Sequence, residues 1–473
     1  MNKLTDRTVI VGGGFTGLFT ALHLTHHNYS RPTILIDKQE KFCFKPLLYE
    51  YLSEEMATDQ VLPRYEDLLK DSGVIFVQDT VSSIDLPQRQ VKLDSGDNYS
   101  YSNLVLAVGS VTGYFGVEGA REHSFPLRSQ EDAIAIKNHL DNCLYQAKET
   151  TDIERRRRLL TVVIVGAGPS GVEMAGTLAD ILPRWYENLG GDRQEIRIIL
   201  LNHGKEILSG DINSDLRKQA EKALQKRAIP VELIMEAKAT VIRPEQLEYQ
   251  RNEEKQIIAT ATTIWTTGTS THPLIKDLAI PDEHRDRHGG LAVTSTLQLP
   301  DYPEVFAAGD CATVEGNSLP PTAQVAYQQG KAIASNLIAL VNAKELQPAE
   351  VNLRGTLLKV GIHNSIANLF NRFEVGGEIG HLIRQGTYLQ LLPTPVHNFQ
   401  VTQEWLSEEI FHTHIKQPQP TSRTNLLWIA SIAAVLVLTC GGLLTWRQVQ
   451  PVKFEHTLKP TGIPFLLNKV IPN

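Results

Sequence analysis

The chain has 473 residues, of which 42% are hydrophobic and 21% are charged, and its formal net charge is −7. This length exceeds one ordinary core, so we expect two or three domains, and the composition excludes a disordered or fibrous protein. The acidic balance argues against a nucleic-acid partner.

The four cysteines, Cys43, Cys143, Cys311 and Cys440, form no CxxC or CxxxxC pair. The spacing therefore argues against a disulfide scaffold and against a zinc site. The first predicted strand begins almost at once, which leaves no room for a signal peptide. We therefore expect the body of the protein to face a reducing, cytosol-like compartment.

The first predicted element is a short β-branched strand from residue 8 to residue 11, followed by a glycine turn that opens a helix. The turn reads GxGxxG, and this strand–turn–helix order is the context that a dinucleotide-binding fingerprint requires. Gly12 allows the tight turn, Gly14 lets the backbone approach a pyrophosphate, and Gly17 permits close packing of helix on strand. The pyrophosphate would then lie at the helix N-terminus.

The next strand, residues 33–37, ends in Asp37, which follows Gly17 by 20 residues. A carboxylate at this place can accept hydrogen bonds from an adenosine ribose. Further strands are predicted at 74–78, 90–93 and 103–109. The last of these is a buried parallel strand whose terminal glycine can lie close to a ligand.

The strand–turn–helix pattern returns about 150 residues later, with a strand at 161–165 and a second GxGxxG formed by Gly166, Gly168 and Gly171. One such motif is weak evidence, but two in this context indicate two dinucleotide-binding folds. The basic run Arg155 to Arg158, just before this strand, is expected to be a solvated linker.

After the second turn we expect a helix at 171–182, and then an insertion that contains Pro183. A strand at 195–201 ends at Asn202, and a strand at 263–268 closes the unit. A buried strand with an acid at its end follows at 305–310, and residues 345–420 form a third unit without a strong catalytic signature.

Residues 426–446 read LLWIASIAAVLVLTCGGLLTW, 21 residues without a charge. This stretch is long enough to cross the hydrocarbon core as a helix, with Trp428 and Trp446 near its ends and Arg423 and Arg447 flanking it. The alternative is a buried core helix, but the absence of a polar face favours a membrane segment. The orientation stays open, because basic residues occur on both sides.

Several motifs together resemble the type II NAD(P)H:quinone oxidoreductases, which are flavoproteins with two dinucleotide-binding domains. The resemblance covers residues 6–410 and rests on VIVGGGFTGL, on KPLLYE at 45–50, on LVLAVGS ending at Ser110, on GAGPSGVEMAG around Glu173, on FAAGDCA around Asp310 and on AQVAYQQ at 323–329. The AQxAxQ element discriminates best, because other dinucleotide flavoproteins need not carry it.

This resemblance implies an α/β fold with two Rossmann-like domains, the second inserted in the first. The FAD domain would comprise 1–125 and 290–342, the NAD(P)H domain 126–289 and a C-terminal domain 343–425, followed by the helix at 426–446 and a tail at 447–473. The implied activity passes hydride from NADH or NADPH to FAD, and two electrons from there to a membrane quinone. The cofactors carry this chemistry, while the protein positions them.

The implied site residues follow from the same resemblance. Glu173 would lie beside the nicotinamide and flavin rings. Gln324 and Gln328 would face flavin and quinone, since a spacing of four places both on one side of a helix. Neutral amides can donate to quinone carbonyls without the penalty of a buried charge. Tyr49 would shape the pocket, and the cofactors would be bound by Gly12, Gly14, Phe15, Thr16, Gly17, Asp37, Lys38, Pro46, Ala107, Gly109, Gly166, Gly168, Gly171, Asn202, His203, Lys205, Gly268, Gly309, Asp310, Ala323 and Gln324. No metal site is expected.

Two features depart from the family pattern. NADH-preferring relatives usually carry Glu where this chain has Asn202, and a neutral amide removes the repulsion of a 2′-phosphate. With His203 and Lys205 nearby, this predicts that NADPH is accepted. The apolar 426–446 helix also differs from amphipathic anchors. Together they resemble the cyanobacterial and plastid branch, which reduces demethylphylloquinone during phylloquinone synthesis.

The expected partners are a membrane quinone (a naphthoquinone, a phylloquinone precursor or plastoquinone), the lipid bilayer and a second copy of the chain in a homodimer. The catalytic domains would face the cytoplasm or stroma. Two alternatives stay open. A sulfide:quinone reductase would need paired redox cysteines, which the spacing does not offer. A membrane-tethered redox sensor would bind FAD and NAD(P)H and turn over slowly.

Overall fold

The computed structural model describes residues 6–210, 213–353, 355–369, 373–394 and 401, all within one compact unit that spans 1–419. The predicted apolar helix at 426–446, the tail and Cys440 lie outside the described residues. Among the residues that are described, no helix has the length and apolar character to cross a membrane.

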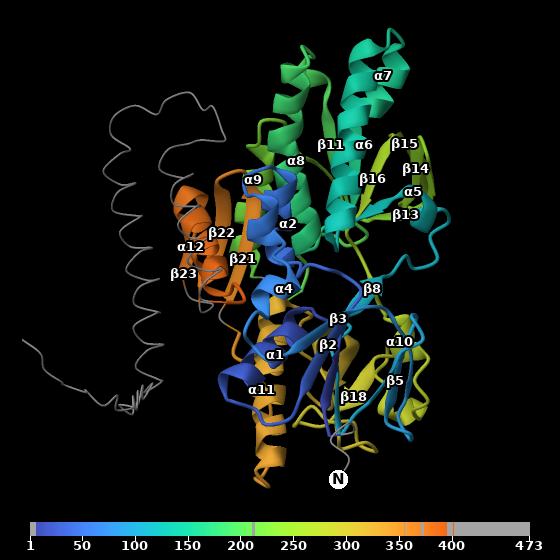
Figure 1. The fold of residues 1–473 in the computed structure, drawn as a ribbon. Helices are drawn as coiled ribbons and strands as arrows, with labels where there is room; N and C mark the ends of the chain where they lie inside the picture. The colour runs from blue at the N-terminus through green and yellow to red at the C-terminus, as the bar shows by residue number, and fades with distance from the viewer. Residues whose placement is uncertain (1–5, 211–212, 354, 370–372, 395–400, 402–473) are drawn as a thin grey trace, which may run out of the picture. The chain divides into compact units, whose positions relative to one another are not determined.

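A five-stranded parallel sheet forms the first fold, in the order β19-β7-β1-β2-β3. Its strands are β1 (Thr8–Val11), β2 (Thr33–Asp37), β3 (Ile75–Gln78), β7 (Asn103–Leu106) and β19 (Val305–Ala307). Helices α1 (Phe15–His26) and α11 (Ala323–Val341) pack against each other beside this sheet (Figure 1). Because β19 joins β7 from 200 residues further along the chain, the first fold is interrupted by an insertion.

A second five-stranded sheet fills that insertion, in the order β12-β11-β10-β16-β9, and all its pairs are parallel. It contains β9 (Phe125–Pro126), β10 (Thr161–Val165), β11 (Arg197–Leu201), β12 (Glu232–Ile234) and β16 (Thr262–Trp265). The helices of this fold are α6 (Gln130–Glu149), α7 (Ile153–Leu160), α8 (Pro169–Asn188) and α9 (Ser214–Gln225). The α/β architecture with two dinucleotide folds is therefore confirmed.

Smaller elements complete these two folds. Two antiparallel sheets are formed by β4 (Val81–Asp85), β5 (Gln90–Leu93) and β6 (Asn98–Ser100), and by β13 (Ala237–Arg243), β14 (Gln246–Arg251) and β15 (Glu254–Ala259). Two strand pairs are β8 (Ser110–Thr112) with β17 (Thr269–Thr271), and β18 (Leu291–Val293) with β20 (Ala312–Val314). The short helices are α2 (Leu48–Leu52), α3 (Thr58–Val61), α4 (Tyr65–Leu68), α5 (Ala120–His123) and α10 (Pro273–Lys276).

A third layer consists of the antiparallel sheet β21 (Gly355–Gly361), β22 (Asn364–Leu369) and β23 (Phe373–Val375) with helix α12 (Gly377–Gln390). Strand β21 packs on α8 of the second fold (Figure 1). A Cβ at Gly176 of α8 would lie 2.6 Å from the carbonyl carbon of Val360, so a glycine is needed for this approach. The third layer is thereby held against the helix that follows the second glycine turn.

Two sequence predictions were wrong. Pro183 lies inside α8, which continues to Asn188. Proline has no N–H for the carbonyl of Ala179, but the backbone N–H of Ile229 donates to that carbonyl at 3.2 Å, which satisfies the freed acceptor. The basic run Arg155 to Arg158 forms the middle half of helix α7 rather than a linker.

Helix α7 forms here because a side chain caps its N-terminus. The Asp152 side chain accepts hydrogen bonds from the backbone N–H groups of Glu154 and Arg155 at 2.9 and 3.2 Å. Arg156 folds back onto the end of α6, where it donates to the carbonyl oxygens of Ala147 and Thr150. A charged sequence thus becomes a helix because its N-terminus is capped and its basic side chains find acceptors.

Candidate functional site

The first glycine turn joins β1 to α1 and leaves the start of α1 accessible. Gly12 has φ of +98°, and a Cβ there would lie 2.5 Å from the carbonyl oxygen of Ala107. A Cβ at Gly17 would overlap the Gly12 carbonyl oxygen. At Gly14, by contrast, no atom of the described chain lies within 4 Å of the Cβ position, and no side chain caps α1. Free space and unpaired N–H groups therefore coincide at this helix start, which fits a pyrophosphate.

Asp37 lies at the end of β2, beside this turn. Its Oδ2 accepts a hydrogen bond from the backbone N–H of Gly13 at 2.6 Å, and its Oδ1 accepts from Gln39 at 2.8 Å. Burial raises the pKa of Asp37, and the two N–H donors act in the opposite direction. Lys38 is exposed. The carboxylate thus lies next to the open helix start, where the predicted ribose contact requires it.

Asp310 approaches the same end of the first sheet from the far side of the insertion. The Ser110 hydroxyl donates to Asp310 Oδ2 at 2.8 Å, and Arg128 Nη2 lies 3.8 Å from the same oxygen. Gly309 has φ of +75°, and its N–H donates to the Gln329 side-chain oxygen at 2.9 Å. Gln329 was absent from the predicted site, although it follows Gln328 directly. It fixes the backbone that carries Asp310.

Other predicted cofactor residues use their side chains for packing. The Phe15 ring meets Phe42 and Phe44 edge-on, with centroids 5.2 Å away in both pairs. The Thr16 hydroxyl donates to the Ala326 carbonyl at 3.3 Å, which ties α1 to α11. Ala107 is buried under Gly12, while Gly109, with φ of +66°, has open space at its Cβ position. These residues shape the turn, and only their backbone is left to face a ligand.

The second glycine turn repeats the geometry of the first. Gly166 has φ of +105°, and a Cβ at Gly171 would overlap the Gly166 carbonyl oxygen. Gly168, the N-cap of α8, again has no described atom within 4 Å of its Cβ position and no side-chain cap. Gly268 has φ of +80°, and a Cβ there would collide with Phe115. The described chain therefore has two helix starts of equivalent geometry, each open at its glycine N-cap and without a side-chain cap.

Asn202 follows β11 next to this second turn. Its side-chain oxygen accepts from the Ala167 N–H at 3.3 Å, and its amide donates to the Glu206 carbonyl at 3.0 Å. His203 and Lys205 are both exposed. The side chain thus links the glycine turn to the loop after β11, and it brings no negative charge to this place.

Glu173 lies two residues after Gly171, in the second turn of α8, and is only 8% exposed. Its Oε1 accepts from the backbone N–H of Lys359 at 3.0 Å and lies 3.5 Å from Arg384 Nη2. Burial raises the pKa of Glu173 to about 7, although Arg384 and the Lys359 N–H act to lower it. A carboxyl with this pKa can take up and release a proton near neutral pH.

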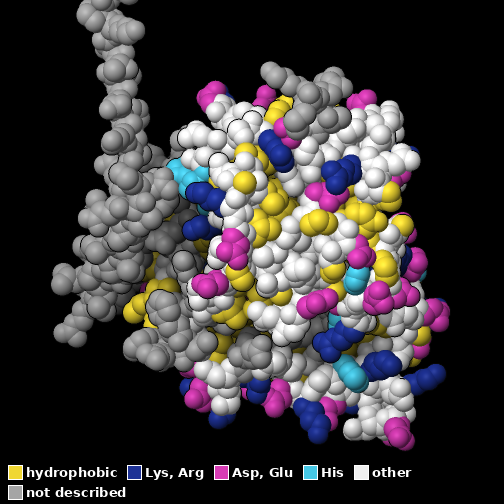
Figure 2. Space-filling view, turned by 90° about the horizontal axis from the view of Figure 1, so that it is seen from below, with side chains coloured by type: hydrophobic (Ala, Val, Ile, Leu, Met, Phe, Trp, Pro, Cys, Tyr) yellow, Lys and Arg dark blue, Asp and Glu magenta, His cyan; other side chains and the backbone are white. Residues whose placement is uncertain are grey.

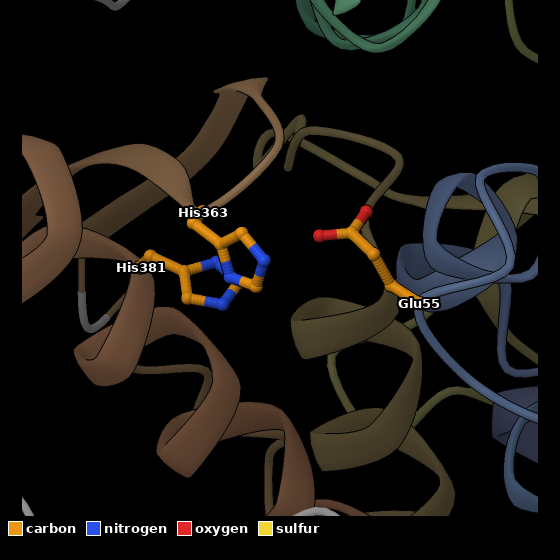
Figure 3. A group of neighbouring side chains, drawn as sticks. All are labelled: Glu55, His363 and His381. Carbon is orange, nitrogen blue, oxygen red and sulfur yellow. The ribbon is translucent and has the colours of Figure 1, made fainter. Parts of the chain in front are cut away.

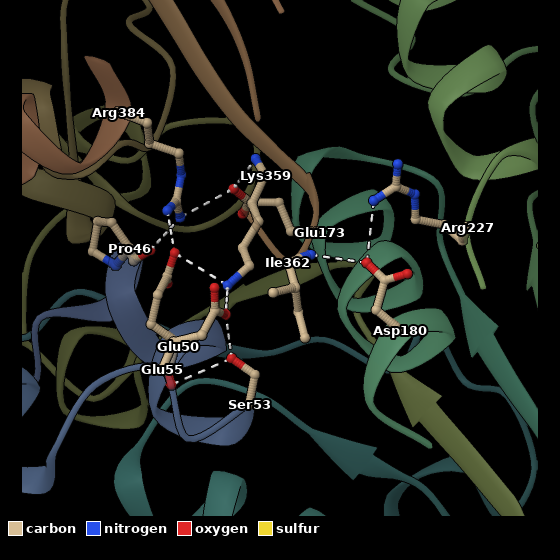
Figure 4. A network of polar contacts seen from close by, with 10 residues as sticks. All are labelled: Pro46, Glu50, Ser53, Glu55, Glu173, Asp180, Arg227, Lys359, Ile362 and Arg384. Carbon is tan, nitrogen blue, oxygen red and sulfur yellow. Dashed lines mark hydrogen bonds and ion pairs between the residues drawn. The ribbon is translucent and has the colours of Figure 1, made fainter. Parts of the chain in front are cut away.

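Arg384 and Lys359 bring two fully buried cations from the third layer to the carboxylates beside Glu173 (Figure 4). Arg384 pairs with Glu50 and donates to the Pro46 carbonyl at 2.7 Å. Lys359 lies 3.3 Å from Glu50 and pairs with Glu55. One charged network therefore joins three parts of the chain, which are segment 46–55 of the first fold, the start of α8 and the third layer.

The sequence did not predict this network. Lys359 and Arg384 lie in the unit that showed no catalytic signature, and Glu50 appeared only as the end of a motif. One signal was present: Lys359 interrupts the strand TLLKVG, where a buried position calls for an apolar residue. Tyr49, which was predicted to shape the pocket, is buried, and its hydroxyl donates to the Ser170 carbonyl at 3.3 Å.

Helix α11 begins at Ala323 and carries Gln324 and Gln328, which were expected on one helix, and both side chains are half-buried. The Gln328 side-chain oxygen accepts from the Asn352 N–H at 2.9 Å, and its amide donates to the Asn352 carbonyl at 3.1 Å. In this conformation Gln328 fastens the segment after α11 to the helix. Its contact with a quinone stays a prediction.

The described cysteines Cys43, Cys143 and Cys311 are unpaired. Burial raises the pKa of Cys43 and of Cys311 to about 12, so neither is a thiolate at neutral pH. The described residues therefore offer no reactive cysteine pair of the kind that disulfide or sulfide chemistry requires.

Comparison with known proteins identifies the family to which the chain belongs. Residues 6–330 match the family model of the pyridine nucleotide-disulphide oxidoreductases. The demethylphylloquinone reductase NdbB of Synechocystis is 34% identical over 87% of this chain and 98% of its own length. The chain belongs to this family, in its type II NAD(P)H:quinone oxidoreductase branch. The resemblance seen in the motifs is thus confirmed.

Two further relatives of this oxidoreductase extend the comparison. The type II NADH:quinone oxidoreductase Ndh of Mycobacterium tuberculosis is 30% identical over 90% of this chain and 94% of its own length. The solved structure of NDH2 from Plasmodium falciparum in complex with NADH superposes with a TM-score of 0.77 at 18% identity, over 86% of this chain and 98% of that one. At this identity the structural match shows the shared fold.

Proposed function

We propose that this oxidoreductase binds FAD at the first glycine turn and NAD(P)H at the second, and reduces a membrane quinone. When bound, the two cofactors supply hydride transfer and electron storage. Membership of the type II branch carries the enzyme class, and the two open helix starts at Gly14 and Gly168 support the two cofactors. We assign residues 1–125 and 290–342 to FAD and 126–289 to NAD(P)H.

The observation that carries the catalytic proposal is the buried carboxyl of Glu173. Reduction of a quinone to a quinol consumes two protons as well as two electrons, and the pKa of Glu173, about 7, lets it hold a proton at its side-chain oxygen at working pH. Arg384 and the Lys359 N–H orient that carboxyl. We propose that Glu173 holds one proton for the quinone and that Gln324 orients a quinone carbonyl.

We propose that NADPH is accepted at the second turn. Asn202 is neutral and is engaged by Ala167 and Glu206, so the loop after β11 keeps its shape without a carboxylate at this place. The exposed Lys205 can approach a 2′-phosphate. Asn202→Glu should shift the ratio of kcat/KM for NADPH to that for NADH downwards by about tenfold or more. An unchanged ratio of the two kcat/KM values would show that Asn202 does not determine the choice between NADPH and NADH.

The quinone that we propose is demethylphylloquinone or a similar naphthoquinone, because the relative with 34% identity is named for that reduction. Such a substrate is apolar, so we propose that the catalytic domains work at a membrane surface. Gln324, Gln328 and Glu173 are the residues proposed to face it.

Steady-state oxidation of NADH and NADPH by the FAD-loaded protein, with a soluble naphthoquinone as acceptor, tests this function. Rapid oxidation that depends on the quinone is the expected result. Flavin reduction by NAD(P)H without onward transfer to the quinone would favour a redox sensor instead.

A further inference from the structure

Beside the charged network lies a group of side chains that neither the motifs nor the proposed reaction uses. Glu55 follows α2, His363 occupies the turn between β21 and β22, and His381 lies in α12. One ligand atom of each lies within 4.8 Å of the others. Figure 3 shows the two imidazoles next to each other, facing the Glu55 carboxylate.

Two side-chain atoms of this group are buried without a partner in the described part of the chain. They are Nδ1 of His381, a residue that is only 2% exposed, and Oε1 of Glu55, whose side chain is 5% exposed. A buried polar atom without a hydrogen bond carries a desolvation penalty of about 1–3 kcal/mol. Two such atoms in one group of side chains call for a bound ion or an ordered water that satisfies them.

The other oxygen of Glu55 is already engaged. Oε2 pairs with Lys359 and accepts a hydrogen bond from the Ser53 hydroxyl, so Oε1 is left to bind separately (Figure 4). Because Glu50 also pairs with Lys359, the positive charge of that lysine is shared between two carboxylates. Since Arg384 pairs with Glu50 as well, the two cations Lys359 and Arg384 balance the two carboxylates Glu50 and Glu55, and a cation at Oε1 would enter a cluster without formal net positive charge.

We propose that Glu55, His363 and His381 bind one divalent transition-metal cation, with Zn²⁺ as the ion that fits best. Two imidazole nitrogens and one carboxylate oxygen are a ligand set that proteins use for zinc, with the fourth position left to water. Ligands at about 2.0–2.1 Å around a tetrahedral zinc are about 3.3 Å apart, so atoms that are at most 4.8 Å apart need to approach by no more than about 1.5 Å. Rotation of the side chains supplies that movement.

The cation would join Glu55 to two histidines that follow it by 308 (363 − 55) and 326 (381 − 55) residues. Glu55 belongs to the segment that carries Pro46 and Glu50, whereas both histidines belong to the third layer. A cation that binds the folded chain but not the unfolded chain raises the stability of the folded state by mass action. The site is thus expected to fasten the third layer to the first fold, beside Glu173 but outside the proposed reaction.

The test uses the full-length FAD-loaded protein, without an affinity tag, after treatment with EDTA and dialysis. Calorimetric titration of the wild type with ZnCl₂ should show saturable binding. One zinc site per chain that the wild type has should be missing in His363→Asn. Asparagine suits this position because His363 has φ of +50°, a conformation that asparagine tolerates. Loss of a ligand should weaken the site at least about tenfold, since even outer-shell changes cost metal sites about 10–100-fold.

His123→Asn is the matched control, since His123 is exposed at the end of α5, and zinc binding should be unchanged. Zinc-edge X-ray absorption should show two imidazole ligands in the wild type, and zinc should raise the Tm of the wild type more than that of His363→Asn. Either absence of saturable zinc binding, or binding of equal strength in wild type, His363→Asn and His381→Asn, would overturn the proposal.

Discussion

Replacement of Glu173 by Gln should remove a pH-dependent penalty on folding. The pKa of Glu173 rises from the ordinary 4.5 to about 7 in the folded chain, a change of 7 − 4.5 = 2.5 units. At about 1.4 kcal/mol per unit, this corresponds to about 3 kcal/mol. The side chain is 11% exposed, so solvent reduces this effect only slightly.

The sign follows from proton binding. Between pH 4.5 and 7 the folded state binds more protons at this carboxyl than the unfolded state does. The contribution of Glu173 to the free energy of unfolding therefore falls as pH rises through that window, and it is lowest above pH 7. Glutamine cannot ionise and keeps an oxygen that accepts from the Lys359 N–H, so the variant lacks this decline.

Urea unfolding of the FAD-loaded wild type and of Glu173→Gln, at pH values from 4.5 to 8, measures this difference. The variant should gain up to about 3 kcal/mol relative to wild type across the window. Glu187→Gln, at the exposed end of the same helix, is the control and should run parallel to wild type. If the free energy of unfolding of Glu173→Gln changes with pH in parallel with that of the wild type, the assignment of a raised pKa to this buried carboxyl is refuted.

Two further predictions concern the glycine turn and the buried cation. Gly14→Ala should weaken FAD retention while the FAD-free chain keeps its Tm, because the new methyl group meets only open space there. Gly17→Ala should instead lower the Tm, because its methyl group would overlap the Gly12 carbonyl oxygen. Flavin release and thermal unfolding of both variants check this contrast, and equal losses of Tm would contradict it. Arg384→Met should destabilise the fold by about 3–5 kcal/mol, since it leaves Glu50 and Glu173 without their guanidinium partner. Urea unfolding measures this loss, and a loss below about 1 kcal/mol would show that the network does not depend on Arg384.

The dinucleotide folds could be predicted because their signal is local. Gly12 and Gly166 sit where φ is positive, and Gly17 and Gly171 sit where a Cβ would overlap the preceding turn, so the sequence had to keep glycine at both turns. The same holds for the acid at the end of β2. Each feature depends on neighbours within a few residues or on a strand of fixed periodicity.

The charged network could not be predicted because it depends on tertiary contacts. Lys359 and Glu55 are 304 residues apart, and Arg384 and Glu50 are 334 residues apart. No periodicity or spacing connects such positions. Gln328 illustrates the converse, since its place on α11 was predicted but its hydrogen bonds to Asn352 depend on where the chain returns after the helix.

Single-turnover reoxidation tests the central claim most directly. The FAD-loaded protein is reduced anaerobically with one equivalent of NADPH, mixed rapidly with a soluble naphthoquinone, and followed by flavin absorbance. We predict reoxidation whose rate rises with quinone concentration and which slows in Glu173→Gln, most strongly at pH values below 7. Flavin that stays reduced in the presence of excess quinone would contradict the assignment of this chain as a quinone reductase.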